Sequence, residues 1–303
     1  MKDKRSGLAK AALALVAIAW GASPVATRFL HRGGGVVLLM EYRFVPLVVV
    51  ILLLLVVRSI KRRDFKVLDL GGFSSIRVIG VSLLGGLGYN GLVSAALTYS
   101  HATIVGISLT TEPIWILILG TLFIRKRLSR GLLLGVALAI VGTVVAAVAA
   151  PGGEAGGSNA VVAVILGVLA TFCWGLYSVL TQDWKISALD MTSWMVICVS
   201  PIVIVAQLLL HPVIPQLNSV SVVISILVVS VISTLLAITG WNFGVSILGS
   251  SLAAPFLYLQ PISSVLLALV FLGETPTLFE VVGLVIIVLG VAISQYLQQV
   301  HVK

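Results

Sequence analysis

A single carboxylate stands in a long apolar run, in the stretch TTEPIW at residues 110–115. Ionisable residues at membrane depth are costly, and they usually face a cavity or a charged partner. Glu112 is followed directly by Pro113, which lacks an N–H and crowds the carbonyl four residues earlier, so it should kink a helix. The pair therefore predicts an interrupted, polar point inside an apolar span.

Arg43 is the predicted partner of this carboxylate. At 1.5 Å per residue, Glu112 lies about 12 Å and Arg43 about 10 Å below the same end of their spans. We expect an ion pair between them, direct or through water. Glu41 competes for Arg43, but residues two apart on a helix do not face each other. Two interpretations stay open: a pair that only fixes helix packing, or Glu112 as a substrate or proton site.

Two tryptophan-containing helix faces are predicted to line a cavity. On the first, Trp20, Ser23, Pro24 and Thr27 recur at helical spacing. On the second, the aligned positions are Trp174, Tyr177, Ser178 and Thr181. The alternative is that the hydroxyls bond back to their own helices and the rings pack between spans.

Further polar and aromatic residues fall at similar depth in other apolar runs. The remaining predicted cavity residues are Tyr89, Asn90, Ser108, Trp115, Trp241, Asn242, Phe256, Gln260 and Ser263. Such a mixture suits an amphipathic solute that carries a ring or an amine. Few basic residues fall in these spans, which disfavours sugar phosphates and nucleotide sugars.

Motifs for soluble-enzyme chemistry are absent from the sequence. The four histidines are far apart, and no metal-binding, nucleophile or phosphate-loop motif is present. We therefore expect no catalytic residue, no metal and no cofactor. Two other functional classes are an intramembrane enzyme that acts on a lipid-linked substrate and a channel. Neither class has in this sequence the residue pattern that it needs.

The composition makes lipid the main solvent of the chain. Of the 303 residues, 59% are hydrophobic and 10% are charged, against about 25% charged in soluble domains. The net charge is +9, but the basic residues gather at the ends of apolar runs, so no nucleic-acid partner is expected. A monomer is expected, and a dimer stays open.

Ten apolar runs are long enough to form transmembrane helices. They are residues 9–30, 36–57, 76–98, 103–124, 131–149, 160–182, 190–210, 220–247, 250–272 and 279–298. The predicted fold is an all-α membrane protein. Most of the 19 lysines and arginines fall on the side of the N-terminus, which predicts cytoplasmic N- and C-termini in an inner membrane.

The two halves of the chain repeat each other. The tryptophan–glycine pair at 20–21 matches that at 174–175, and Pro113 in TTEPIW matches Pro261 in YLQPIS. The predicted domains are residues 1–150, a linker at 151–159, and residues 160–303.

Each repeat holds five spans, and an odd number inserts the second copy upside down. Inverted repeats are typical of secondary transporters with a midplane site. Pro113 and Pro261 are the predicted hinges of alternating access.

These features resemble the EamA-like members of the drug/metabolite transporter superfamily. The resemblance rests on the two tryptophan–glycine pairs, on Arg43-Phe44, on EPIW and QPIS, and on FLGETPT at 271–277. It implies export or exchange of amino acids, related metabolites or drugs, through a cavity lined largely by spans 1, 3, 4, 6, 8 and 9.

Overall fold

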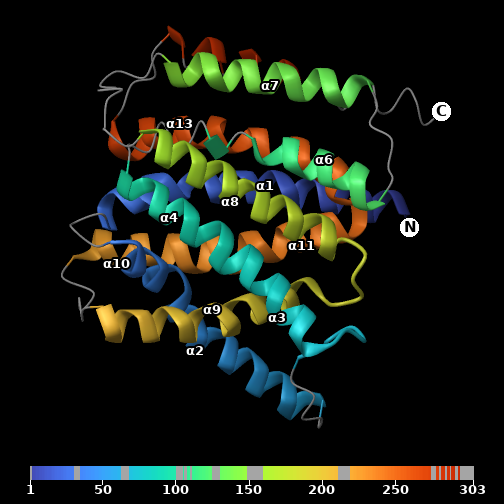
Figure 1. Ribbon diagram of the computed structural model, residues 1–303, viewed down its shortest axis with the longest axis vertical. Coiled ribbons are helices and arrows are strands. Elements are labelled where there is room, and N and C mark those ends of the chain that lie inside the picture. The colour runs from blue at the N-terminus through green and yellow to red at the C-terminus, as the bar shows by residue number, and fades with distance from the viewer. Residues whose placement is uncertain are drawn as a thin grey trace.

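The fold is all-α over the part of the chain that the computed structural model describes. This part comprises residues 2–30, 35–62, 68–99, 105, 108–109, 111–124, 130–148, 160–210, 219–273, 278–279, 281–283, 285–286, 288–290 and 293. Its regular structure is helical, with no strand among these residues, which confirms the predicted fold class (Figure 1).

The helices follow one another with short connections. The α-helices are α1 (Lys2–Leu30), α2 (Val36–Arg62), α3 (Ser75–Leu83), α4 (Asn90–Tyr99), α6 (Glu112–Ile124), α7 (Arg130–Val148), α8 (Ala160–Thr181), α9 (Ala188–Leu210), α10 (Val220–Leu227), α11 (Ala237–Leu248), α12 (Ser250–Ala253) and α13 (Leu259–Leu272). Two π-helical segments, η1 (Leu84–Tyr89) and η2 (Val228–Leu236), and a 3₁₀ segment, η3 (Ala254–Tyr258), continue them.

Seven helices in the described residues are long and apolar enough to cross a membrane, and three shorter apolar helices accompany them. The shorter ones are Glu112–Phe123, Leu133–Gly142 and Val281–Gly290. Each of the ten predicted spans overlaps one of these helices, while the count of ten crossings stays a prediction.

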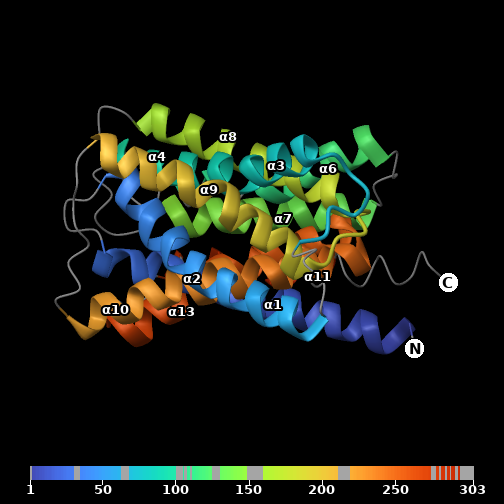
Figure 2. The same cartoon turned by 90° about the horizontal axis from the view of Figure 1, so that it is seen from below.

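The helices form two layers, and each layer contains helices from both halves of the chain (Figure 2). One layer holds α3, α4, α6 and α8, and the other holds α1, α10, α11 and α13. Helix α8 packs on α4 and α6, while α1 packs on α11 and α13. Helices α2 and α9 contact each other and run from one layer to the other. Each layer thus combines the first helix of one half with later helices of the other half.

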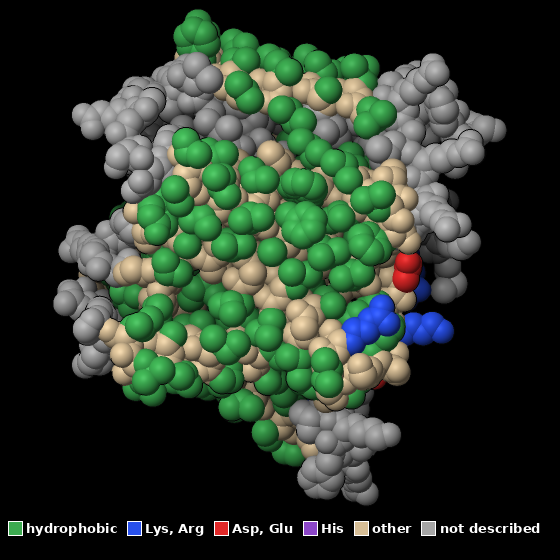
Figure 3. Space-filling model, in the orientation of Figure 1, with side chains coloured by type: hydrophobic (Ala, Val, Ile, Leu, Met, Phe, Trp, Pro, Cys, Tyr) green, Lys and Arg blue, Asp and Glu red, His purple; other side chains and the backbone are tan. Residues whose placement is uncertain are grey.

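The surface explains where this protein resides. Its broad face is covered by hydrophobic side chains, and the visible charged groups gather at one edge (Figure 3). Large apolar residues such as Leu209, Ile60 and Val270 are 79%, 72% and 73% exposed. Exposed apolar patches of this extent need a non-aqueous environment, so the chain is a multi-pass membrane protein.

The π-helical segments widen the helices beside the bundle centre. A π turn leaves carbonyls without their usual i+4 partners, and side chains bond to them here. The Asn90 side chain donates to the carbonyls of Gly85 and Gly86 at 3.4 and 3.1 Å, and the Thr234 hydroxyl donates to the carbonyl of Val229 at 2.7 Å. Both segments are therefore built into the fold by their own side chains.

A group of contacts, here called the inter-half clasp, joins the two halves at one end of the bundle. Arg58 of α2 makes a two-pronged ion pair with Asp190 of α9, which is 1% exposed. The Phe73 ring stacks on Trp184 with centroids 4.4 Å apart, and the guanidinium of Arg77 lies over both rings. The clasp fixes this end in the observed conformation.

Candidate functional site

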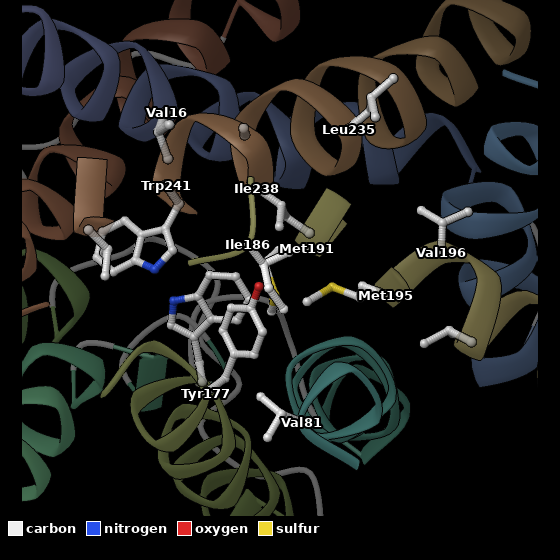
Figure 4. Packing of buried hydrophobic residues seen from close by; sticks show 14 of the residues in the cluster. Val16, Val81, Tyr177, Ile186, Met191, Met195, Val196, Leu235, Ile238 and Trp241 are labelled. Carbon is white, nitrogen blue, oxygen red and sulfur yellow. The ribbon is translucent and has the colours of Figure 1, made fainter. Parts of the chain in front are cut away.

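Five of the predicted cavity residues meet in one aromatic cluster. Trp174 of α8 is its centre, with ring centroids 5.4 Å from Trp20, 6.2 Å from Trp241, 5.1 Å from Tyr89 and 5.2 Å from Tyr177. Figure 4 shows Trp241 and Tyr177 approaching each other from α11 and α8 within the buried core. The cluster thus joins the first helices of both halves.

The rings pack on one another rather than line an open cavity in this conformation. Trp174, Tyr177 and Trp241 are at most 1% exposed. Neighbouring helices bond to most of the polar ring atoms. The Trp20 indole N–H donates to the carbonyl of Ser233 at 2.9 Å, and the Tyr177 hydroxyl donates to Asn242 Oδ1 at 2.9 Å.

Glu112 is the first residue of α6 and is 4% exposed. Its Oε2 accepts a hydrogen bond from the Tyr89 hydroxyl at 3.4 Å. Among the described residues, its Oε1 has no hydrogen-bond partner. A helix N-terminus stabilises a negative charge, and the aromatic cluster lies next to this carboxyl through Tyr89.

The direct form of the predicted Glu112–Arg43 ion pair is not present in this conformation. Arg43 donates instead to Ser23 Oγ at 2.9 Å and to Thr234 Oγ1 at 3.4 Å. Equal depth along two helices does not fix rotation about their axes, and the Arg43 side chain points toward α1 and η2. A water-bridged pair stays a prediction.

Other buried polar atoms, on α6, α8 and η3, also lack a hydrogen-bond partner among the described residues. In the described part of the chain, the indole N–H groups of Trp115 and Trp174 and the hydroxyl of Tyr258 are buried without a partner. Tyr258, which is 2% exposed, belongs to η3, which packs against α6. Sequence reasoning missed Tyr258, although a phenol two residues before Gln260 in an apolar run was a signal.

The two tryptophan–glycine pairs bring helices close in a matched way. A Cβ on Gly21 of α1 would lie 2.9 Å from the carbonyl oxygen of Gln260 and would overlap the hydroxyl of Ser263, both on α13. A Cβ on Gly175 of α8 would lie 2.9 Å from Trp115 Cβ on α6. Each glycine thus places its neighbouring tryptophan in the cluster by letting the other half approach.

Of the remaining predicted residues, Ser178 accepts a hydrogen bond from the Trp241 indole N–H at 3.0 Å. Ser108 donates to the carbonyl of Val105 at 2.6 Å, and Phe256 packs on the main core.

The two prolines differ from the predicted interior kinks. Pro113 stands in the first turn of α6, and Pro261 stands in the first turn of α13 after η3. A proline in the first turn of a helix loses no hydrogen bond there, so each span is interrupted just before its proline. The hinge role of both prolines stays a prediction. Separately, Glu274 of the FLGETPT motif lies outside the described residues.

The apolar surface, the exchanged helix layers and the buried polar site define a membrane protein of the transporter class. The chain belongs to the EamA-like transporter family, which matches residues 8–148 and 161–296, and with it to the drug/metabolite transporter superfamily. It is similar to an uncharacterised transporter of Archaeoglobus fulgidus, with 24% identity over 290 residues that cover 93% of this chain and 96% of that relative. A solved crystal structure shares the fold, with a TM-score of 0.74, 17% identity and 98% coverage of both chains.

Proposed function

We propose that this transporter carries a small amphipathic solute, with a ring or an amine, by alternating access around the aromatic cluster. Export or exchange across an inner membrane, with both termini cytoplasmic, is part of the proposal. The observation that carries it is Glu112 Oε1, which has no hydrogen-bond partner among the described residues and lies beside five clustered rings at the junction of the two halves.

The chemistry of solute recognition follows from the polar groups that have no hydrogen-bond partner among the described residues. A solute ammonium would complete the bonding of Glu112 Oε1, and the faces of Trp174 and Tyr89 would attract the same cation. A proton would complete the carboxyl equally well. Glu112 is therefore proposed as the site where solute and proton compete.

Alternating access is supported by the matched packing of the halves. Gly21 against α13 and Gly175 against α6 are equivalent contacts in opposite layers. Inverted repeats around a shared site rock against each other in many carriers. Exchange of this kind would open the cluster first to one side and then to the other, with Pro113 and Pro261 at the helix interruptions.

A thermal-shift screen of the purified protein would identify the solute class. Ligands that bind the folded state raise the melting temperature by mass action. We expect amines with a ring to raise it, and sugar phosphates to leave it unchanged. A rise with sugar phosphates alone would contradict the proposed chemistry.

Flux in proteoliposomes would then test transport by the solute found. A carrier gives saturable flux that internal solute stimulates, whereas a channel or an enzyme does not. In Glu112→Gln, we expect solute flux to fall roughly tenfold or more, because a hydrogen bond to a charged group contributes about 1.5–3 kcal/mol. A wild-type rate and pH profile in this variant would remove Glu112 from the proposal.

A further inference from the structure

A half-buried cation, Arg43, has only neutral hydrogen-bond partners in the described part of the chain. Its two terminal nitrogens donate to the hydroxyls of Ser23 and Thr234. Its electrostatic neighbour is the phenol of Tyr89. A charge inside a membrane-spanning helix usually has an opposite charge or a polar cavity beside it, and in the described residues this guanidinium has no negative partner.

The carboxylates nearest in the sequence and in the site do not supply that partner. Glu41 is two positions away on the same helix, where side chains do not face each other. Glu112 accepts a hydrogen bond from the Tyr89 hydroxyl and makes no ion pair with Arg43. No ion pair of Arg43 is present among the residues that the structure describes.

A small cavity of about 40 Å³ lies against Arg43. Its polar wall includes Thr27, Asn90 and Ser94, and apolar side chains of α1, α2, α4 and η2 complete it. About 10–15 Å³ of such volume holds one water, so the cavity has room for a few waters or for one compact ion. Its apolar walls offer nothing to the hydration shell of a multiply charged anion.

We propose that this cavity is an anion site in which Arg43 binds one compact monovalent anion. The planar guanidinium has five N–H donors and matches a carboxylate in two-pronged geometry. The anion is either a free halide ion or the carboxylate of a solute, and the chemistry of recognition is the same. Neither Glu112 nor Tyr89 lines this cavity, and the site does not require the proposed transport.

The test measures the melting temperature of purified wild-type protein in sodium salts of constant ionic strength. Gluconate, which is too large for the cavity, is the reference salt. We expect chloride, formate or both to give a saturable rise of roughly 2–8 °C over gluconate. A rise with chloride alone identifies a halide site, and a rise with formate identifies a carboxylate site. No saturable rise with either salt would overturn the proposal.

Two variants and a control locate the effect. Arg43→Gln should abolish the rise, whereas Arg77→Gln, on the clasp and away from the cavity, should keep it. If Arg43→Gln does not fold, Val93→Leu narrows the cavity and leaves Arg43 in place. This variant should keep the gluconate melting temperature within about 2 °C and lose the rise. A rise that survives in Arg43→Gln, or in folded Val93→Leu, would overturn the proposal.

Discussion

The two halves of the molecule share their packing but differ in their charges. Gly21 and Gly175 make the same close approach to the opposite half. At the start of the helices that they meet, Glu112 in the first half corresponds to Gln260 in the second. The packing contact is therefore present in both halves, whereas at these matched positions the carboxylate is present in the first half alone.

The arginine shows the same asymmetry. Arg43 on α2 corresponds to Cys198 on α9, so both charged groups beside Tyr89 come from the first half. The second half contributes neutral partners, such as Thr234 to Arg43. In the proposed mechanism, the symmetric packing serves motion between two similar states, and the single set of charges serves one ligand site.

The strongest test of shared packing enlarges the two glycines. Gly21→Leu and Gly175→Leu should each cost about 1–3 kcal/mol or more, because backbone or Cβ atoms of the opposite half occupy the space. Melting temperature and monodispersity on size exclusion report the loss. Gly80→Leu is the matched control, because nothing lies within 4 Å of a Cβ there. Tolerance of one of the two site variants would show that the halves do not share this contact.

The next test moves the charge between the halves. Gln260→Glu in the Glu112→Gln background keeps one carboxylate but places it in the second half. Because the Tyr89 hydroxyl bonds to Glu112, we expect less than about a tenth of wild-type flux, with folding retained. Recovery of wild-type flux would show that either half can hold the carboxylate.

The matched tryptophans offer a smaller contrast. The Trp20 N–H satisfies the carbonyl of Ser233, whereas in the described chain the N–H of Trp174 has no partner. Trp20→Phe should therefore lower stability by about 1–3 kcal/mol more than Trp174→Phe beyond the loss of ring area. Chemical denaturation of both variants measures the difference, and equal losses would contradict this assignment.

The smallest expected effect on stability is that of Tyr258→Phe. Its buried hydroxyl has no partner in the described residues, so its removal should leave the free energy of unfolding unchanged within about 0.5 kcal/mol or raise it. Solute affinity should fall if the hydroxyl bonds to the ligand. A stability loss above about 1 kcal/mol would show that Tyr258 already has a structural partner.

The sequence predicted the helices and the rings better than the pairing of the charges. Hydropathy located the apolar helices that the structure describes, and helical spacing put Trp20 and Trp174 on faces that do meet. Depth along a helix, however, is one coordinate, and the partner of Arg43 depends on rotation and helix packing. Tyr258 was missed for the same reason, since only the fold brings η3 beside α6.

The inter-half clasp has a consequence for how readily this end of the bundle separates. Pulling α2 from α9 would separate the carboxylate of Asp190, which is 1% exposed, from the guanidinium of Arg58, so water or another cation has to replace Arg58 when this end opens. The Arg58–Asp190 pair thus favours the observed conformation of this end over one in which α2 and α9 have parted.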